Sequence, residues 1–100
     1  MENKLKNLIQ NCNELISQKG YLELGHINDV RIEAEKISDN EDEISNLVLD
    51  CEDYLQDNYN CIDDALSGYV YSKELNFKDI EEFYNYFDIT EEEIQEKYKF

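Results

Sequence analysis

The sequence predicts an all-α fold, a compact bundle of about four to six helices. Two observations indicate this class: apolar residues recur at three- and four-residue steps over most of the 100 residues, and proline is absent. The three glycines stand apart, so no glycine-rich linker divides the chain. A chain of this length suits one domain with a radius of gyration of about 13 Å. We therefore expect residues 1–100 to form a single acidic helical domain.

The first two helices are expected before residue 38. A helix that runs to about Gln18 is indicated by six apolar residues on one face: Leu5, Leu8, Ile9, Cys12, Leu15 and Ile16. Gly20 can take the left-handed conformation that ends such a helix. A second helix is indicated by the spacing of Ile27, Val30, Ala34 and Ile37, whereas residues 21–24 are ambiguous.

A third apolar stripe begins after residues that suit a helix N-cap. Ser38, Asp39 and Asn40 can each accept a hydrogen bond from a free backbone N–H group. The stripe comprises Ile44, Leu47, Val48, Cys51, Leu55, Ile62 and Leu66. We expect it to be helical, with a break near residues 58–60.

The last third of the chain is expected to hold an irregular connection and then further helices. Residues 68–76 are the least periodic, and the strand-like residues 69–71 are too few to found a sheet, so we assign this segment to a connection. Asn76 is expected to cap a helix with Phe77, Ile80, Phe83, Tyr84 and Phe87 on one face. Thr90 and Glu93 form a capping box before a last helix that contains Ile94 and Tyr98.

The charge of the chain is strongly negative and unevenly placed. The formal net charge is −16, and no lysine or arginine occurs between Ile37 and Ser72, where ten carboxylates lie. A negative surface repels nucleic acid and anionic membranes and attracts basic protein surfaces. We therefore expect no direct nucleic-acid binding, no membrane association and a basic protein partner.

The candidate partner-binding residues follow this charge. Asp39, Asp42, Asp50, Asp53, Asp57 and Asp64 recur at separations that array several of them along an exposed helix face, with Asp63 beside them. Tyr54, Tyr59, Tyr69 and Tyr71 would add flat contact area, and Glu81 and Glu82 would extend the charge. The alternative interpretation is a solvated helix face with half-buried core tyrosines.

In charge, size and aromatic content the chain resembles the small acidic DNA-mimic inhibitors of phages and mobile elements, which include anti-CRISPR and antirestriction proteins. The resemblance implies a non-enzymatic inhibitor that occupies the basic nucleic-acid site of a target such as a defence nuclease. That class has no shared fold, so the resemblance assigns no individual residue. Two alternatives stay open: a helical adaptor or regulatory subunit that binds through an apolar face, and an immunity protein against a nuclease toxin. Pairing of two copies through an aromatic face is a further option.

Catalytic and cofactor sites are not expected. His26 is the only histidine, and no nucleophile motif lies near it, so we expect no enzyme. A calcium loop starting at Asp39 fails because Ile44 stands where glycine is required and Asp50 where glutamate is usual. No glycine-rich phosphate loop occurs, so neither a metal nor a cofactor is expected.

The cysteines and the apolar runs bear on the compartment. Cys12, Cys51 and Cys61 are odd in number and lie within apolar stripes, which favours reduced thiols that pack in the core. The N-terminal stretch is amphipathic, and no run approaches the roughly 20 apolar residues that span a bilayer. These observations predict a soluble cytoplasmic protein.

Overall fold

The computed structural model describes residues 2–25, 27–64, 68–90, 92–93 and 96, and in them the chain forms a mixed α/β domain. The elements in chain order are α1 (Glu2–Lys19), β1 (Tyr21–Glu23), α2 (Asp29–Glu35), α3 (Glu41–Asn58), β2 (Asn60–Asp64), β3 (Gly68–Ser72) and α4 (Ile80–Tyr86). The expectation of an all-α bundle is therefore wrong. The reason is a three-stranded antiparallel sheet that residues 21–23, 60–64 and 68–72 build.

The strand β3 is the centre of this sheet, which has the order β1-β3-β2. Residues 69–71, expected in an irregular connection, are paired on both sides, because Tyr71 lies opposite Leu22 in β1 and Cys61 in β2. The expected helical continuation of the third stripe is also wrong, since α3 ends at Asn58 and Ile62 lies in β2. Leu66 lies outside the described residues.

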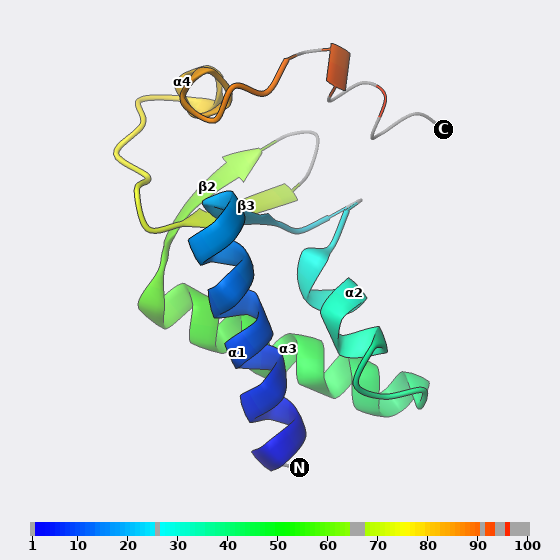
Figure 1. Cartoon of the computed structure of the whole chain (residues 1–100). Helices are drawn as coiled ribbons and strands as arrows, with labels where there is room; N and C mark the ends of the chain where they lie inside the picture. Colours follow the sequence, from blue (N-terminus) through cyan, green and yellow to red (C-terminus); the bar gives the residue numbers. More distant parts are fainter. Residues whose placement is uncertain (1, 26, 65–67, 91, 94–95, 97–100) are drawn as a thin grey trace.

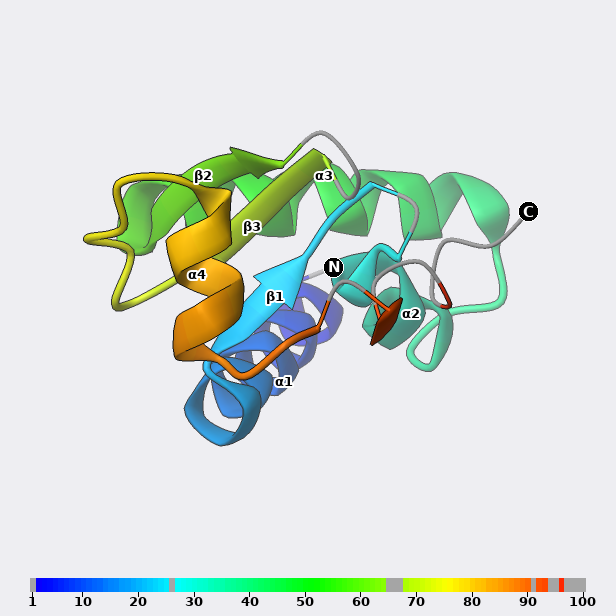
Figure 2. The ribbon, with the colours of Figure 1, turned by 90° about the horizontal axis from the view of Figure 1, so that it is seen from above.

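Helices cover both faces of the sheet (Figures 1 and 2): α1, α2 and α3 lie on one side, and α4 lies on the other. Successive side chains of a strand point to opposite faces of the sheet. Leu22 and Tyr71 therefore belong to the core cluster with α1–α3, whereas Tyr21 and Val70 pack with Phe83 of α4. The α1–α3 cluster has twelve buried residues: Leu8, Cys12, Ile16, Leu22, Leu24, Val30, Ala34, Ile44, Leu47, Cys51, Leu55 and Tyr71.

Side chains cap three of the helices at their N-termini. Asn28 accepts from the amide of Arg31 at 3.0 Å, and Asn40 accepts from the amide of Glu43 at 2.9 Å. The cap of α4 is Asp79, so the expected start at Asn76 is too early. These caps fix where α2, α3 and α4 begin.

The junction between α1 and β1 depends on Gly20. Its φ of +96° lies in the left-handed region, and its amide bonds to the carbonyl of Ile16 at 2.8 Å, as expected for a helix C-terminus. A Cβ at this position would overlap the ring of Phe87, which packs over the junction after α4. Gly20 therefore lets the α4 layer approach the end of α1.

The segment after α4 is described in part. Asp88 has a φ of +56°, and the amide of Ile89 bonds to the carbonyl of Tyr84 at 2.8 Å, which is a Schellman-type helix end. The expected capping bond of Thr90 forms, since its hydroxyl accepts from the amide of Glu93 at 3.1 Å. The expected residues Ile94 and Tyr98 lie outside the described residues.

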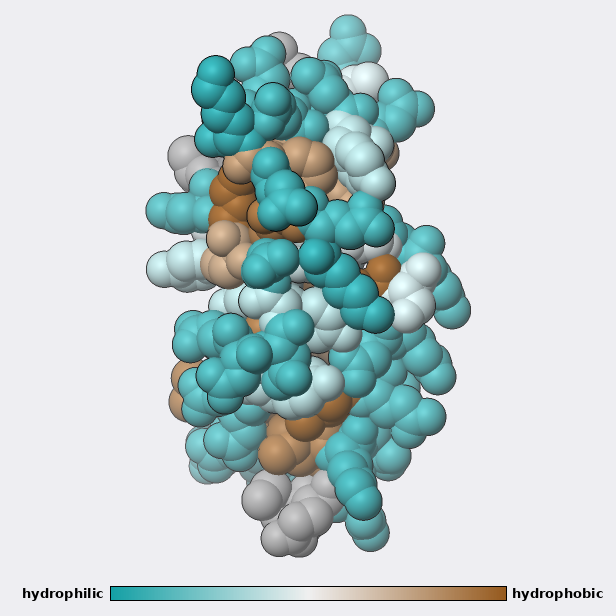
Figure 3. Space-filling model, turned by 90° about the vertical axis from the view of Figure 1, so that its left-hand side faces the viewer, coloured by the Kyte–Doolittle hydropathy of each residue, from teal (hydrophilic) through white to brown (hydrophobic). Residues whose placement is uncertain are grey.

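The surface in Figure 3 is largely hydrophilic, with apolar atoms gathered in the layer of α4 and nearer the end where α1 begins. Within the described part of the chain, none of the helices combines the length and the apolar character that crossing a membrane requires.

Candidate protein-binding surface

The helix α3 presents four exposed aspartates on one side, Asp42, Asp50, Asp53 and Asp57, which we name the α3 acidic row. At about 100° per residue they fall within about 80° of the helix circumference. The opposite side carries the buried residues Ile44, Leu47, Cys51 and Leu55. Core packing therefore holds the α3 acidic row toward solvent.

Basic side chains from other elements neutralise two neighbours of the row. Arg31 of α2 pairs with Glu41 at 2.5 Å, and Lys4 of α1 pairs with Glu43 at 2.6 Å. The hydrogen bonds from Lys4 and Ser38 lower the pKa of Glu43. Within residues 2–25, 27–64 and 68–90, no ion pair involves a member of the α3 acidic row, so no basic side chain of these residues compensates its charge.

Two further residues of α3 were not expected in the surface. Leu49 is 60% exposed and lies beside the row, where its neighbour Val48 packs on the core. Glu52 lies on the side nearer α2, where burial raises the pKa of its carboxyl and Asn28 donates a hydrogen bond to it. The sequence signal for Leu49 is that it falls outside the three- and four-residue steps of the buried stripe.

The four tyrosines of the expected site differ in exposure. Tyr71 is 2% exposed in the central strand, so it is a core residue, whereas Tyr69 is 52% exposed. Tyr54 and Tyr59 are half-buried against the α1–α3 core, and both hydrogen-bond to Asn13 of α1. Only Tyr69 among the four therefore offers a largely free ring.

The remaining acidic residues of the expected site lie elsewhere. Asp39 is exposed just before α3, Asp63 is exposed on β2, and Asp64 pairs with Gly68 through the backbone. Glu81 and Glu82 are exposed on α4, which lies across the sheet from α3 (Figure 1). The fold thus divides the expected site into an α3 surface, a β2 surface and an α4 surface.

The chemistry of these surfaces is that of charge and hydrogen bonding. Among the described residues, no group of three or more His, Cys, Asp or Glu side chains is placed to hold a metal ion. His26 lies outside the described residues. A shallow hollow of about 260 Å³ lies at the α1 edge of the row, between Lys4, Glu43 and Asp50.

Comparisons with known proteins give no information on the function of this surface. No protein-family model matches the chain, and searches of curated proteins and of solved structures found no match. A fold alone does not imply a function, so a function has to be inferred from the chemistry of the surface.

Proposed function

We propose that this protein is a non-enzymatic inhibitor that binds the basic nucleic-acid-binding surface of another protein by presenting DNA-like negative charge. The α3 acidic row would be the centre of contact, as in an anti-CRISPR or other phage anti-defence protein. The observation that carries the proposal is that the four aspartates of the row have no ion-pair partner in the described part of the chain. The compartment would be the reducing cytoplasm, consistent with the free thiols of Cys12, Cys51 and Cys61.

The α3 acidic row carries its charges less densely than a DNA strand carries its phosphates. Asp42 and Asp57 are fifteen residues apart, which is about 22 Å along a helix at 1.5 Å per residue. One DNA strand carries about six phosphates over that length, at about 3.4 Å each. Four carboxylates therefore give less charge than DNA, and Asp39, just before α3, would add to them.

Binding would exchange water and counterions on the target's arginine and lysine side chains for carboxylates. Charge-assisted hydrogen bonds and electrostatic steering both favour such an encounter, and both weaken as salt screens the charges. An immunity protein that neutralises a nuclease toxin would use the same surface and the same forces. Salt sensitivity is therefore shared by both versions of the proposal.

The exposed side chain of Leu49 favours a second candidate, an adaptor that binds through apolar contacts. Leu49 is 60% exposed on α3, and Ile32 is 45% exposed on α2. An interface centred on such residues would persist at high salt, because burial of apolar surface is not screened. The salt response of the partner separates the two candidates.

The test begins with capture of partners from lysate at low and high salt, with and without competing duplex DNA. Any purified partner is then bound to a labelled duplex, and the duplex is displaced with wild-type protein or with the variant D50K/D53K/D57K. We expect the wild type to displace DNA and the variant to fail. The variant should keep its helical circular dichroism, because all three aspartates are exposed.

A matched control carries the same change of net charge elsewhere. Glu14, Glu92 and Glu96 are exposed and lie outside α3, so the variant E14K/E92K/E96K should still displace the duplex. Equal loss in both variants would show that net charge acts without a defined surface. A partner that resists salt and ignores DNA would refute the inhibitor proposal and favour the adaptor.

A further inference from the structure

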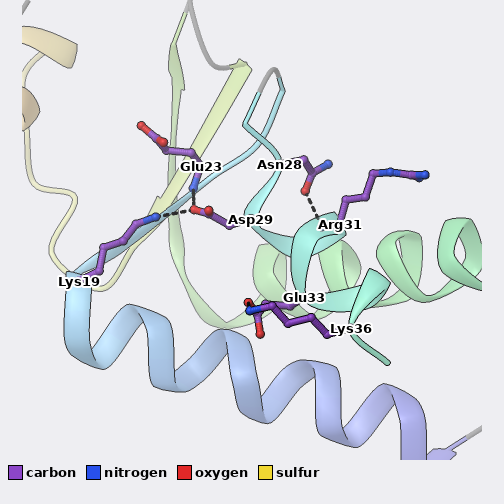
Figure 4. Close-up of polar contacts among 7 residues, drawn as sticks. All are labelled: Lys19, Glu23, Asn28, Asp29, Arg31, Glu33 and Lys36. Atoms are coloured by element: carbon purple, nitrogen blue, oxygen red, sulfur yellow. Dashed lines mark hydrogen bonds and ion pairs between the residues drawn. The ribbon is translucent and has the colours of Figure 1, made fainter. Parts of the chain in front are cut away.

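The two edges of the sheet differ in the hydrogen-bond partners of their outward-facing backbone groups. At the β1 edge the amide of Glu23 donates to a carboxylate oxygen of Asp29 at 2.9 Å, and Lys19 pairs with the same oxygen at 2.6 Å (Figure 4). Asp29 in the first turn of α2 thus gives the outward amide of Glu23 a hydrogen-bond partner at this edge. Figure 2 shows β2 as the outermost strand on the other side, away from α1.

One hydrogen bond between β1 and β3 shows which backbone N–H and C=O groups of β2 face away from the sheet. The carbonyl of Tyr69 accepts from the amide of Leu24 at 2.8 Å, so Tyr69 directs its backbone groups toward β1. Because these directions alternate along an antiparallel strand, Val70 directs its groups toward its partner Ile62 in β2. Cys61 and Asp63, on either side of Ile62, therefore point their N–H and C=O groups away from the sheet.

This edge is accessible and acidic. Cys61 and Asp63 are both exposed, and among the described residues no backbone hydrogen bond joins them to anything beyond β3. The nearest basic residues in sequence are Lys36 and Lys73, outside the whole of α3 and β2. A strand edge with free N–H and C=O groups is a template for another extended chain.

We propose that the β2 edge binds an extended basic segment of a protein partner as a fourth strand. The segment would exchange main-chain hydrogen bonds with Cys61 and Asp63 and place a lysine or arginine beside the carboxylate of Asp63. A second copy of this chain is a poor occupant, because each copy carries a net charge of −16 and would bring its own Asp63 to the contact. The proposal rests on the proposed function, to which it adds the conformation of the bound segment.

The test separates the charge of Asp63 from its amide. D63N removes the charge and keeps the N–H, whereas D63P removes both, and neither changes the β2–β3 ladder because this amide points outward. The probe is an acetylated six-residue peptide of alternating lysine and valine, titrated by NMR with amide hydrogen exchange. Two further peptides carry N-methyl groups on the three lysines or on the three valines, so that each blocks one of the two strand edges and keeps every charge.

We expect the unmodified peptide to bind wild type and D63N and to protect the amides of Cys61 and Asp63 from exchange in wild type. D63P should bind the peptide at least about tenfold more weakly than D63N does, which is the loss expected for one or two main-chain hydrogen bonds. The peptide N-methylated on its binding edge should show a similar loss against the wild type. This arm needs no variant, so it decides the matter even where D63P fails to fold.

The proposal is overturned if the N-methylated peptides bind as well as the parent, or if D63P binds as well as D63N. Peptide-induced shifts confined to Asp50, Asp53 and Asp57 would overturn it too, because they would place the peptide on α3. Failure here leaves the DNA-displacement test of the α3 acidic row untouched. Conversely, exchange protection at β2 can be observed whether or not D50K/D53K/D57K still displaces DNA.

Discussion

Replacement of Asp29 is the perturbation whose cost follows most directly from the structure. Its carboxylate joins the end of α1, the edge of β1 and the start of α2, because it accepts from Lys19 and from the amide of Glu23 (Figure 4). The side chain is 13% exposed, so little water is available to replace these bonds. We compare D29A, which removes the acceptor, with D29N, which keeps an amide oxygen for Glu23.

The expected losses can be worked out for each contact. A hydrogen bond to a charged acceptor contributes about 1.5–3 kcal/mol when its loss leaves a donor unsatisfied. The Lys19 partner is 31% exposed, so its ion pair adds less than about 1 kcal/mol. We therefore expect D29A to lower the free energy of unfolding by about 2–3 kcal/mol and D29N by about 1 kcal/mol, with the helix dipole of α2 contributing to both.

The assay is urea unfolding followed by circular dichroism, with hydrogen exchange of the Glu23 amide as a local readout. D29A should also lower the melting temperature by roughly 10 °C or more, since about 1 kcal/mol corresponds to about 4–8 °C in a domain of this size. Exchange at Glu23 should quicken in D29A more than in D29N. A D29A loss below about 0.5 kcal/mol, or equal losses in both variants, would refute the reasoning that the backbone bond dominates.

Three other outcomes test the core. Phe83 is fully buried in the α4 layer, so F83A should lower the free energy of unfolding by about 3–5 kcal/mol in urea titrations, and a loss below about 1 kcal/mol would show that α4 does not pack there. Burial and nearby carboxylates raise the pKa of Tyr21 from 10.0 to about 12. The neutral phenol is thus favoured by folding, and the stability it contributes is complete below pH 10 and is lost as the pH rises toward 12. Y21F should remove that part of the alkaline decline in melting temperature, and an unchanged decline would contradict this. Iodoacetamide should modify only the exposed Cys61 in the folded protein, because Cys12 and Cys51 are fully buried, and the hydrogen bond with Cys51, together with burial, raises the pKa of the Cys12 thiol. Mass spectrometry that finds three adducts before unfolding would contradict this packing.

The long amphipathic helices were predictable from the sequence because their information is local. The α1 stripe ends where Gly20 takes a left-handed conformation, and Asn40 was among the expected caps of α3. The sheet was not predictable in this way. Its first strand has three residues, and Leu22 finds its partner Tyr71 far along the chain, so no local period reports the pairing.

The same cause limited prediction of the site. The exposure of Asp50, Asp53 and Asp57 follows from the helical stripe and was expected, because a buried side fixes its opposite. The burial of Tyr71 depends on β3 being a central strand covered on both faces, which the sequence did not indicate. Without the sheet, the placement of α4 across it from α3 had no basis either.

The end of α3 offers a further argument about why the row is acidic. Acidic side chains in the first turn of a helix complement its dipole, but Asp57 lies in the last turn, where negative charge is unfavourable by about 0.3–1 kcal/mol. Its i,i+4 neighbour Asp53 adds like-charge repulsion of about 0.2–0.5 kcal/mol. D57K should therefore raise the free energy of unfolding by about 1 kcal/mol in urea titrations, while it weakens displacement of DNA from the target. A residue that lowers stability where a basic one would raise it is expected at a binding surface and not on a merely solvated face. If D57K leaves the free energy of unfolding unchanged, Asp57 does not destabilise the fold, and its position in the last turn of α3 gives no support for a role in binding.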